Sequence, residues 1–294
     1  MLSKQYPPLK SWFITLCIVA VLFIGCTVLA NKYSAHIAYT RHTLEADYLL
    51  KNTLKNIDSY PEKIQVVAIG SSLVGHGIAC SSEYQNQYTN VCLSKVFLNS
   101  NTEILNTLNN VGVFDSLLIH LPDILLIESD QLAYKVEDER SLKDHFFKGA
   151  YFLYNLKTTI SMNAGNYRMP DYCGKIISGV LSDTSGYQYI NRKSVSFNDR
   201  KYMHSKLAEL SKRGVKIYLI HIPRPAITES VLHSGIQEQV FLKLMNSYQK
   251  EFQTTYIQFP EKLNFTYFYD FGHLNDVGRK KYSDWLYAQI IKTK

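Results

Sequence analysis

The sequence contains few residues of the kinds that break or crosslink a chain. Among 294 residues there are 8 prolines, 14 glycines and 5 cysteines. Charged residues make up only 19% and hydrophobic residues 46%, which excludes a disordered chain, a collagen-like repeat and a coiled coil. Lys and Arg number 32 against 25 Asp and Glu, but no dense basic block of the kind that grips nucleic acid is present. We therefore expect a folded protein that binds no nucleic acid.

The five cysteines lack the spacing of a zinc site, and we expect neither a metal nor a cofactor. Cys80 and Cys92 bracket a polar stretch, residues 81–90, which has the composition of a loop that a disulfide pins. Such a bond belongs to an oxidising compartment and would favour an exported body. Two ordinary free thiols are the alternative, and the sequence leaves both open.

A long uncharged apolar run extends from residue 11 to residue 30. A helix of about 20 residues is about 30 Å long, the thickness of a bilayer's hydrocarbon core. We interpret residues 11–31 as an uncleaved single-span anchor after a short tail, residues 1–10, because no Ala-x-Ala-like cleavage site follows. The residues before Cys26 resemble a lipobox, so a lipid anchor on this cysteine is the alternative. We regard it as the minority interpretation.

The orientation of this anchor is less clear from the sequence. Basic residues flank both of its sides, so the positive-inside rule nearly ties. The cysteine pattern is the remaining hint, and from it we expect the body outside the cytoplasm. Residues 32–61 have the polar pattern of a helical stalk that ends at Pro61.

Beyond the stalk, apolar strand-like runs alternate with helical segments. Five runs are strand candidates of the buried, parallel kind: residues 64–69, 95–99, 124–127, 215–220 and 256–259. Helices are expected at residues 102–120, 201–213, 235–252 and 276–291. The alternation predicts an α/β fold over residues 62–294, a three-layer α/β/α sandwich with a mostly parallel sheet. Residues 131–198, rich in Tyr, Asn, Gly and Ser, break the pattern and are interpreted as an inserted cap.

Two motifs lie where a parallel sheet binds its ligands, beyond the carboxyl ends of the strands. Ser72 stands in a Gly-Ser-Ser turn after the first strand, where its hydroxyl is exposed and its N–H lies near a helix start. Asp270 precedes His273 by three residues before the last helix. At this spacing the carboxylate can accept a ring N–H and leave the other nitrogen as a general base. Each motif alone has a structural alternative. The Gly-Ser-Ser turn could be an ordinary loop, and Asp270 could be a helix cap beside an unrelated histidine.

Together the two motifs resemble those of the SGNH/GDSL-type hydrolase superfamily, in its membrane-anchored O-acyltransferase- and esterase-like branch. The order of elements resembles that of the family over about residues 64–293, while the sharp motifs cover only the two ends. The resemblance implies that Ser72 is the nucleophile and that His273 and Asp270 complete its triad. Ser71 stands where better-known members have Asp.

The middle blocks depart from the family pattern. The resemblance implies Ser72 and Asn101 as oxyanion donors, but the second strand ends without the expected glycine, and Gly112 falls inside a predicted helix. After the third strand, residues 128–130 are Glu-Ser-Asp instead of Gly-x-Asn. An ionised carboxylate aimed at an oxyanion would oppose catalysis. Either Asp130 faces elsewhere, or Asn101 supplies the missing donor, or the oxyanion hole is poor.

Three further residues are candidates for substrate binding. Ser71 and His76 flank the nucleophile, and Arg224 follows the fourth strand at the same edge of the sheet. Arg224 could bind an anionic substrate group. The structural alternatives are a solvated turn histidine and an ordinary surface arginine.

The expected function is that of a membrane-tethered serine acyl esterase or O-acyltransferase. The anchored relatives imply acylated cell-envelope glycans, or another acyl ester, as substrate, and protein partners in an envelope assembly. The alternative is a catalytically inactive module of the same fold that binds glycan or scaffolds a polysaccharide assembly. A lipid-directed esterase is a third, weaker alternative.

Overall fold

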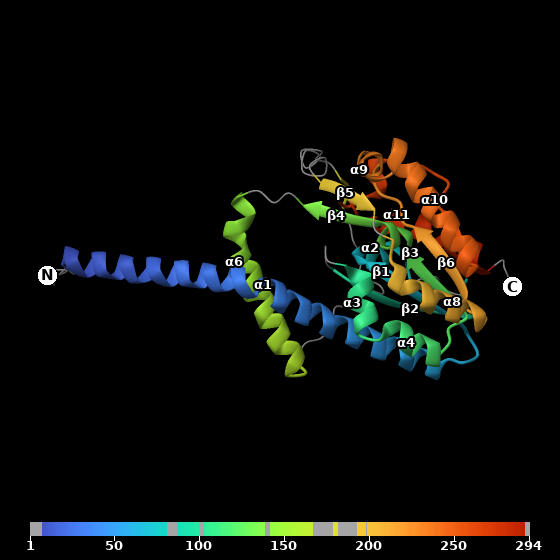
Figure 1. Cartoon of the computed structure of the whole chain (residues 1–294), viewed down its shortest axis with the longest axis horizontal. Coiled ribbons are helices and arrows are strands. Elements are labelled where there is room, and N and C mark those ends of the chain that lie inside the picture. Colours follow the sequence, from blue (N-terminus) through green and yellow to red (C-terminus); the bar gives the residue numbers. More distant parts are fainter. Residues whose placement is uncertain are drawn as a thin grey trace. The chain divides into compact units, whose positions relative to one another are not determined.

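In a computed structural model of the chain, the described residues are 8–80, 87–99, 103–138, 142–166, 179–181, 193–197 and 199–291. The chain divides into two compact units. Residues 1–44 and 140–168 form the first unit, and residues 45–139 and 169–294 form the second. The second unit contains the five-stranded sheet (Figure 1).

The first unit contains most of α1 (Leu9–Ser59) together with α6 (Leu142–Asn163). α1 is long and apolar enough to cross a membrane. Its large apolar side chains, among them Trp12, Phe13 and Leu16, are exposed, as they are in a helix that lipid covers. Arg41 Nη1 of α1 donates to Asn155 Oδ1 of α6 at 2.7 Å.

The last turns of α1 belong to the second unit. The polar segment expected as a stalk is helical up to Ser59, and residues 45–59 form part of the body. Ala46 and Leu50 are buried in the core, and Asn56 Nδ2 donates to Ser94 Oγ at 3.0 Å. This part of the helix therefore helps to cover the sheet instead of only spacing it from the anchor.

The sheet has five strands in the order β2-β1-β3-β6-β7, and every pair is parallel. Each strand overlaps one of the runs predicted from the sequence: β1 (Ile64–Ser71), β2 (Val91–Leu98), β3 (Ile124–Glu128), β6 (Lys216–His221) and β7 (Thr255–Gln258). β1 and β3 are buried along their whole length, because helices cover both of their faces. The predicted α/β class with a parallel sheet is confirmed.

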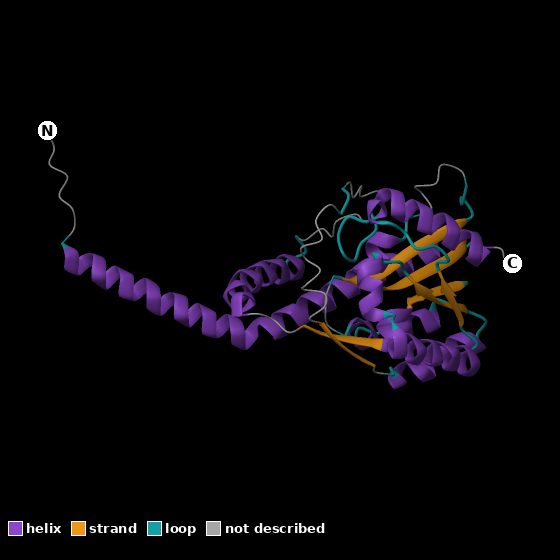
Figure 2. Cartoon of the chain, turned by 90° about the horizontal axis from the view of Figure 1, so that it is seen from above, coloured by secondary structure: helices purple, strands orange, loops and turns teal. Residues whose placement is uncertain are grey.

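Alternate residues of the central strands enter two separate cores. Val67 and Ile69 of β1 face the core that contains the inner part of α1 and five further helices: α3 (Ile104–Asn110), α4 (Val113–Ile119), α5 (Ser129–Ala133), α8 (His204–Lys212) and α10 (Gly235–Phe252). Val66 and Ala68 face α2 (Ser72–Gly77) and α11 (Asp276–Ile291) on the other side. Figure 2 shows the strands with helices on both sides, which is the predicted three-layer sandwich.

The helix predicted over residues 102–120 is broken in the structure. α3 ends at Asn110 and α4 begins at Val113, with Gly112 between them at a φ of 82°. This left-handed conformation ends a helix and is favoured by glycine. The apolar periodicity continues through the break because both short helices pack on the same core, so periodicity alone did not reveal it.

The suggested pairing of Cys80 with Cys92 is wrong. Cys80 is disulfide-bonded, whereas Cys92 is a free thiol. Side chains of a strand alternate between its faces, so Cys92 lies on the face of β2 that Ser94 shares with α1. Residues 78 and 79, next to Cys80, pack in the core on the opposite face. The sheet therefore separates the two cysteines.

The region interpreted as an inserted cap contains the end of α5 (Ser129–Ala133), together with β4 (Tyr134–Asp138), α6 and β5 (Lys193–Phe197). β4 and β5 pair antiparallel in a separate two-stranded sheet. The other described elements are α9 (Ala226–Leu232) and two 3-10 turns, η2 (Lys201–Met203) and η3 (Phe265–Tyr267).

Candidate active site

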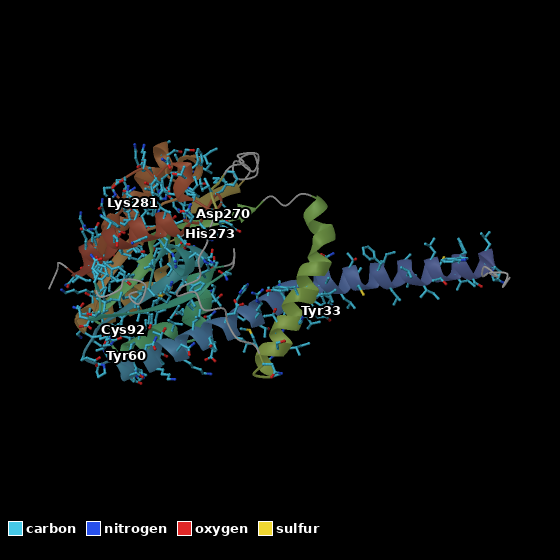
Figure 3. The ribbon with its side chains drawn as sticks, turned by 180° about the vertical axis from the view of Figure 1, so that it is seen from behind. Tyr33, Tyr60, Cys92, Asp270, His273 and Lys281 are labelled. Carbon is cyan, nitrogen blue, oxygen red and sulfur yellow. The ribbon has the colours of Figure 1, made fainter. Side chains whose placement is uncertain are left out.

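A serine, a histidine and an aspartate form a hydrogen-bonded chain beyond the carboxyl end of β1. Ser72 Oγ lies 2.8 Å from His273 Nε2, although 201 residues separate them in the sequence. His273 Nδ1 lies 2.9 Å from Asp270 Oδ2. Since a carboxylate only accepts, Nδ1–H donates to Asp270, and Nε2 is left to accept the serine hydroxyl. Figure 3 labels Asp270 and His273 at this end of the strands and Cys92 at the other.

The serine is positioned by the abrupt turn from β1 into α2. Ser71, the last residue of β1, caps α2, and its Oγ accepts a hydrogen bond from Leu73 N at 3.1 Å. Ser72 is therefore the first residue of the helix, and its N–H has no acceptor within the helix. A backbone N–H at the start of a helix, beside the nucleophile, can serve as the donor that an oxyanion requires.

The histidine is positioned by a tight turn that Asp270 organises. Asp270 Oδ1 accepts the backbone N–H groups of Gly272 at 2.8 Å and His273 at 2.7 Å, as in an Asx-turn. Asn275 fixes the end of this turn, because its Nδ2 donates to the carbonyls of Thr266 and Gly179, each at 2.8 Å. The Asp-x-x-His-x-Asn motif thus builds its own rigid loop.

The same contacts set the charge of Asp270. Burial alone would raise its pKa, but the hydrogen bonds from His273 and from the backbone N–H of Gly272 outweigh burial and lower the pKa. Asp270 is therefore ionised at neutral pH. An ionised carboxylate at Nδ1 stabilises the imidazolium that forms when Nε2 takes a proton.

Two contacts hold α2 that the sequence did not suggest. Lys95 of β2 is buried, and its Nζ donates to the carbonyls of Gly75 at 2.9 Å and Ile78 at 2.8 Å, at the end of the helix. Gly75 packs on the ring of Phe97, so closely that a Cβ would lie 2.4 Å from Cε2. A lysine inside a buried strand was the signal that could have revealed the first contact.

The residues predicted to bind substrate have defined contacts. Ser71 is buried as the cap of α2, and the His76 ring packs edge-on against His273 with centroids 5.5 Å apart. Arg224 is buried and forms ion pairs with carboxylates. Asn101, the second predicted oxyanion donor, lies outside the described residues. The structure thus brings Ser71 and His76 to the triad and places Arg224 in a charged cluster.

That buried cluster lies under the serine turn. We define it by six residues: Glu128, Asp130, His221, Arg224, Glu229 and His233. Asp130 Oδ2 lies 2.5 Å from Arg224 Nη1, so this carboxylate is paired with a guanidinium. Glu128 Oε2 accepts the backbone N–H of Ser71 at 2.7 Å. The cluster therefore contacts the backbone of the turn that carries the nucleophile.

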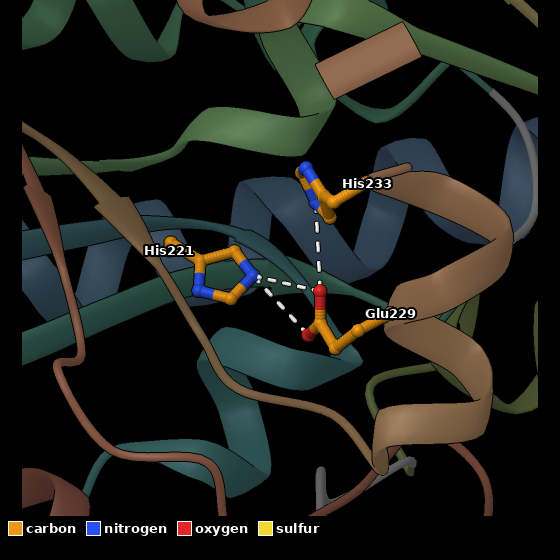
Figure 4. Close-up of side chains that lie close together, drawn as sticks. All are labelled: His221, Glu229 and His233. Atoms are coloured by element: carbon orange, nitrogen blue, oxygen red, sulfur yellow. Dashed lines mark hydrogen bonds and ion pairs between the residues drawn. The ribbon is translucent and has the colours of Figure 1, made fainter. Parts of the chain in front are cut away.

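Charges within the cluster shift one another's titration. Burial raises the pKa of Glu128. Burial would lower the pKa of His221, but the carboxylates of Glu229 and Asp130 outweigh it and raise the pKa. His221, Glu229 and His233 offer ligand atoms within 4.8 Å of one another, a set that could hold a metal ion (Figure 4). The sequence analysis missed this set because His233 and Glu229 lie on or beside a helix that it did not place.

The comparisons with known proteins add little to this geometry. No model of a known protein family matches the sequence, and no curated protein matches it. Among solved structures, that of "a putative platelet activating factor from Streptococcus pneumonia" is similar at 13% identity and a TM-score of 0.32. The match covers 83% of this chain and 93% of that chain. A likeness at this level carries no information about chemistry, which rests on the atoms of the site itself.

Proposed function

We propose that the protein is a membrane-tethered serine acyl esterase or O-acyltransferase. The observation that carries the proposal is the continuous chain from Ser72 Oγ through the His273 ring to Asp270, with distances of 2.8 Å and 2.9 Å. A serine needs an adjacent base to become a nucleophile at neutral pH, and the base needs a third group to hold its tautomer. This chain has all three in hydrogen-bond range.

The proposed reaction proceeds in two halves. Ser72 Oγ attacks the acyl carbonyl carbon while its proton passes to His273 Nε2, and the Ser72 N–H donates to the oxyanion that forms. Collapse breaks the ester bond, returns the proton to the leaving alcohol and leaves an acyl-serine. Water or a sugar hydroxyl then attacks the acyl-serine by the reverse sequence of proton transfers. Esterase and transferase therefore share every residue and differ only in the second nucleophile.

The carboxyl groups near the turn do not oppose this chemistry as strongly as the sequence suggested. Asp130 is paired with Arg224, and burial raises the pKa of Glu128, so that this carboxyl ionises less readily than an exposed one. Neither group therefore presents an uncompensated full charge to an oxyanion. This supports catalysis over the alternative of an inactive binding module.

The substrate class belongs to the proposal on weaker grounds. The motifs resemble those of SGNH/GDSL-type enzymes that are anchored at the membrane, which suggests acylated envelope glycans as substrates and envelope-assembly proteins as partners. α1 supplies a helix that could anchor the chain. The disulfide at Cys80 supports an oxidising compartment, outside the cytoplasm, for the body.

The experiment that tests the proposal is covalent labelling of the nucleophile. The full chain in detergent is treated with a fluorophosphonate, and the modified peptide is identified by mass spectrometry. We expect labelling at Ser72 in the wild type, none in Ser72→Ala, and normal labelling in Ser230→Ala, which changes an exposed serine outside the triad. Absence of labelling in a correctly folded wild type, or labelling of another serine, would favour the glycan-binding module instead.

Turnover separates the two enzymatic variants of the proposal. p-Nitrophenyl acetate is hydrolysed in buffer alone and again with a saturating oligosaccharide that carries free hydroxyls. For a transferase, we expect the acetyl group on the oligosaccharide, detected by its added mass. For an esterase, acetate is released at the same rate with or without the acceptor.

A further inference from the structure

We infer that His221, Glu229, His233 and Asp130 form a binding site for one divalent transition-metal ion, of which Zn²⁺ fits best. The inference does not depend on the catalytic role of Ser72. The four residues come from the end of β6, from α9 and its carboxyl cap, and from α5. They are brought together only by the fold.

Three of the distances between the proposed ligand atoms are close to the edge of a tetrahedral zinc site. Glu229 Oε2 lies 3.2 Å from His221 Nε2 and 3.7 Å from His233 Nε2, and His233 Nε2 lies 3.3 Å from Asp130 Oδ1. Zinc binds imidazole and carboxylate ligands at about 2.0–2.1 Å, which makes the edge of its coordination tetrahedron about 3.3–3.4 Å. A small movement of Glu229 would equalise the three distances.

Neighbouring groups hold these ligands in the orientation that a metal needs. Tyr134 OH lies 3.3 Å from His233 Nδ1, so that nitrogen can donate to the tyrosine and leave Nε2 free to coordinate. The backbone N–H of Arg224 donates to Glu229 Oε1 at 2.8 Å, which leaves Oε2 facing the histidines. Asp130 uses Oδ2 for Arg224 and keeps Oδ1 toward His233. Figure 4 shows His221 and His233 converging on Glu229.

Two of the four atoms that would bind the metal are buried and make no hydrogen bond within the described part of the chain, whereas His221 Nε2 already contacts Glu229 Oε2 at 3.2 Å. His233 Nε2 and Asp130 Oδ1 make none with any described residue, although both side chains are less than 10% exposed. Buried polar atoms in this state cost free energy unless a partner satisfies them. A dication would give both atoms a partner, and imidazole nitrogens and carboxylate oxygens are suitable ligands for it.

A metal in this position would link α9 to the end of β6. It would thereby hold in place two backbone segments that carry residues of the candidate active site. Thr228 of α9 donates through Oγ to the carbonyl of Phe271, inside the turn between Asp270 and His273, at 2.7 Å. On the other side of the cluster, Glu128 holds the backbone of Ser71. We therefore assign the metal a positioning role, with no contact to substrate.

Metal content and cobalt spectroscopy test the site. The full chain in detergent is loaded with Zn²⁺, dialysed, and analysed by inductively coupled plasma mass spectrometry. We expect about one zinc per chain in the wild type and in His120→Gln, a surface control, and far less in His233→Gln. Tyr134→Phe keeps the ligands but loses their orientation, and we expect about 10- to 100-fold weaker binding.

Cobalt keeps the test decisive where a ligand variant fails to fold. Wild-type protein loaded with Co²⁺ is expected to show the intense visible bands of a tetrahedral site without a thiolate charge-transfer band. A thiolate band would place the ion at one of the free cysteines, Cys17, Cys26 or Cys92, and overturn the assignment. The assignment also fails if the loaded wild type retains less than a tenth of an equivalent of zinc, or if His120→Gln loses as much metal as His233→Gln.

Discussion

The candidate triad consists of side chains that are unreactive alone: Ser72, His273 and Asp270. Each depends on a hydrogen bond to the next for its chemical role. The Ser72 hydroxyl has its acceptor at 2.8 Å, and the His273 ring is held by two contacts to Asp270. His273 is only 26% exposed, so solvent competes weakly for these hydrogen bonds. Because the three groups act as one catalytic unit, removal of one side chain abolishes the contribution of the other two to catalysis.

We expect that substitutions in this chain are not additive. Ser72→Ala removes the atom that forms the acyl-enzyme, and His273→Ala is expected to cost a comparable factor in kcat, while the double variant adds little. Asp270→Asn keeps the geometry but favours the wrong tautomer, with an expected loss of about 10⁴. The measurement is p-nitrophenyl acetate turnover at equal melting temperature. Independent, multiplying losses in the double variant would contradict the triad.

The lowered pKa of Asp270 predicts a pH dependence of stability. Because the folded pKa lies below the ordinary value of about 3.9, the ionised carboxylate stabilises the fold above about pH 4. That stabilisation is lost as the pH falls through the folded pKa. Asp270→Asn lacks it throughout, so we expect its deficit in Tm to be full at neutral pH and to shrink below about pH 4.

Differential scanning fluorimetry between about pH 7 and pH 3 measures this deficit. Asp115→Asn, which changes a carboxylate on the exposed side of α4, controls for general acid effects. A Tm deficit of Asp270→Asn that stays constant down to about pH 3 would show that the carboxylate is not stabilised by its partners.

Among the elements, α2 is the one whose placement decides whether the site works. It is only six residues long and is fixed at both ends, by the Ser71 cap at its start and by Lys95 at its end. Its middle rests on Phe97 through Gly75. Short helices have little stability of their own, so these contacts determine where Ser72 points.

Gly75→Ala is expected to displace α2. The added Cβ would lie 2.4 Å from the Phe97 ring, and overpacking of this kind costs about 1–3 kcal/mol. A shift of about 1 Å at Ser72 can cost about 10²-fold in rate. Turnover and Tm are measured beside Gly25→Ala, a helical glycine with nothing within 4 Å of the new Cβ. Equal behaviour of the two variants would contradict tight packing under α2.

At the scale of the whole molecule, α1 links a membrane-compatible segment to the sheet-containing unit in one uninterrupted helix. Its 51 residues correspond to about 77 Å, more than twice the thickness of a bilayer core. Ala46 and Leu50 of the inner part of α1 are buried in the core, whereas the large apolar side chains of residues 11–29 are exposed. The same helix therefore meets two different environments.

We expect the segment of residues 11–30 to span the membrane with the remainder outside the cytoplasm. Alkaline phosphatase and β-galactosidase are fused after Lys32 and after the last residue. Phosphatase activity at both fusion points is the expected result, because that enzyme folds only where disulfides form. Activity of β-galactosidase alone would place the body in the cytoplasm and leave the disulfide at Cys80 without an oxidising environment.

The sequence by itself determined the local features of this protein. Continuous apolar runs specify buried parallel strands, and the Gly-Ser-Ser turn and the Asp-x-x-His motif each carry their own hydrogen-bonding pattern. These features depend on residues within a few positions of one another. For that reason the five strands, the three-layer arrangement and the candidate triad could all be proposed before any coordinates.

Only the tertiary structure decided which face of a strand a side chain occupies and which distant residues it contacts. The alternation of β2 separates Cys80 from Cys92, the conformation of Gly112 divides one expected helix into two, and α9 brings His233 to Asp130. Arg224 appeared to be a candidate for substrate because nothing near it in sequence shows the buried carboxylates that it meets. Contacts between distant segments follow from strand order and helix packing, which no local pattern encodes.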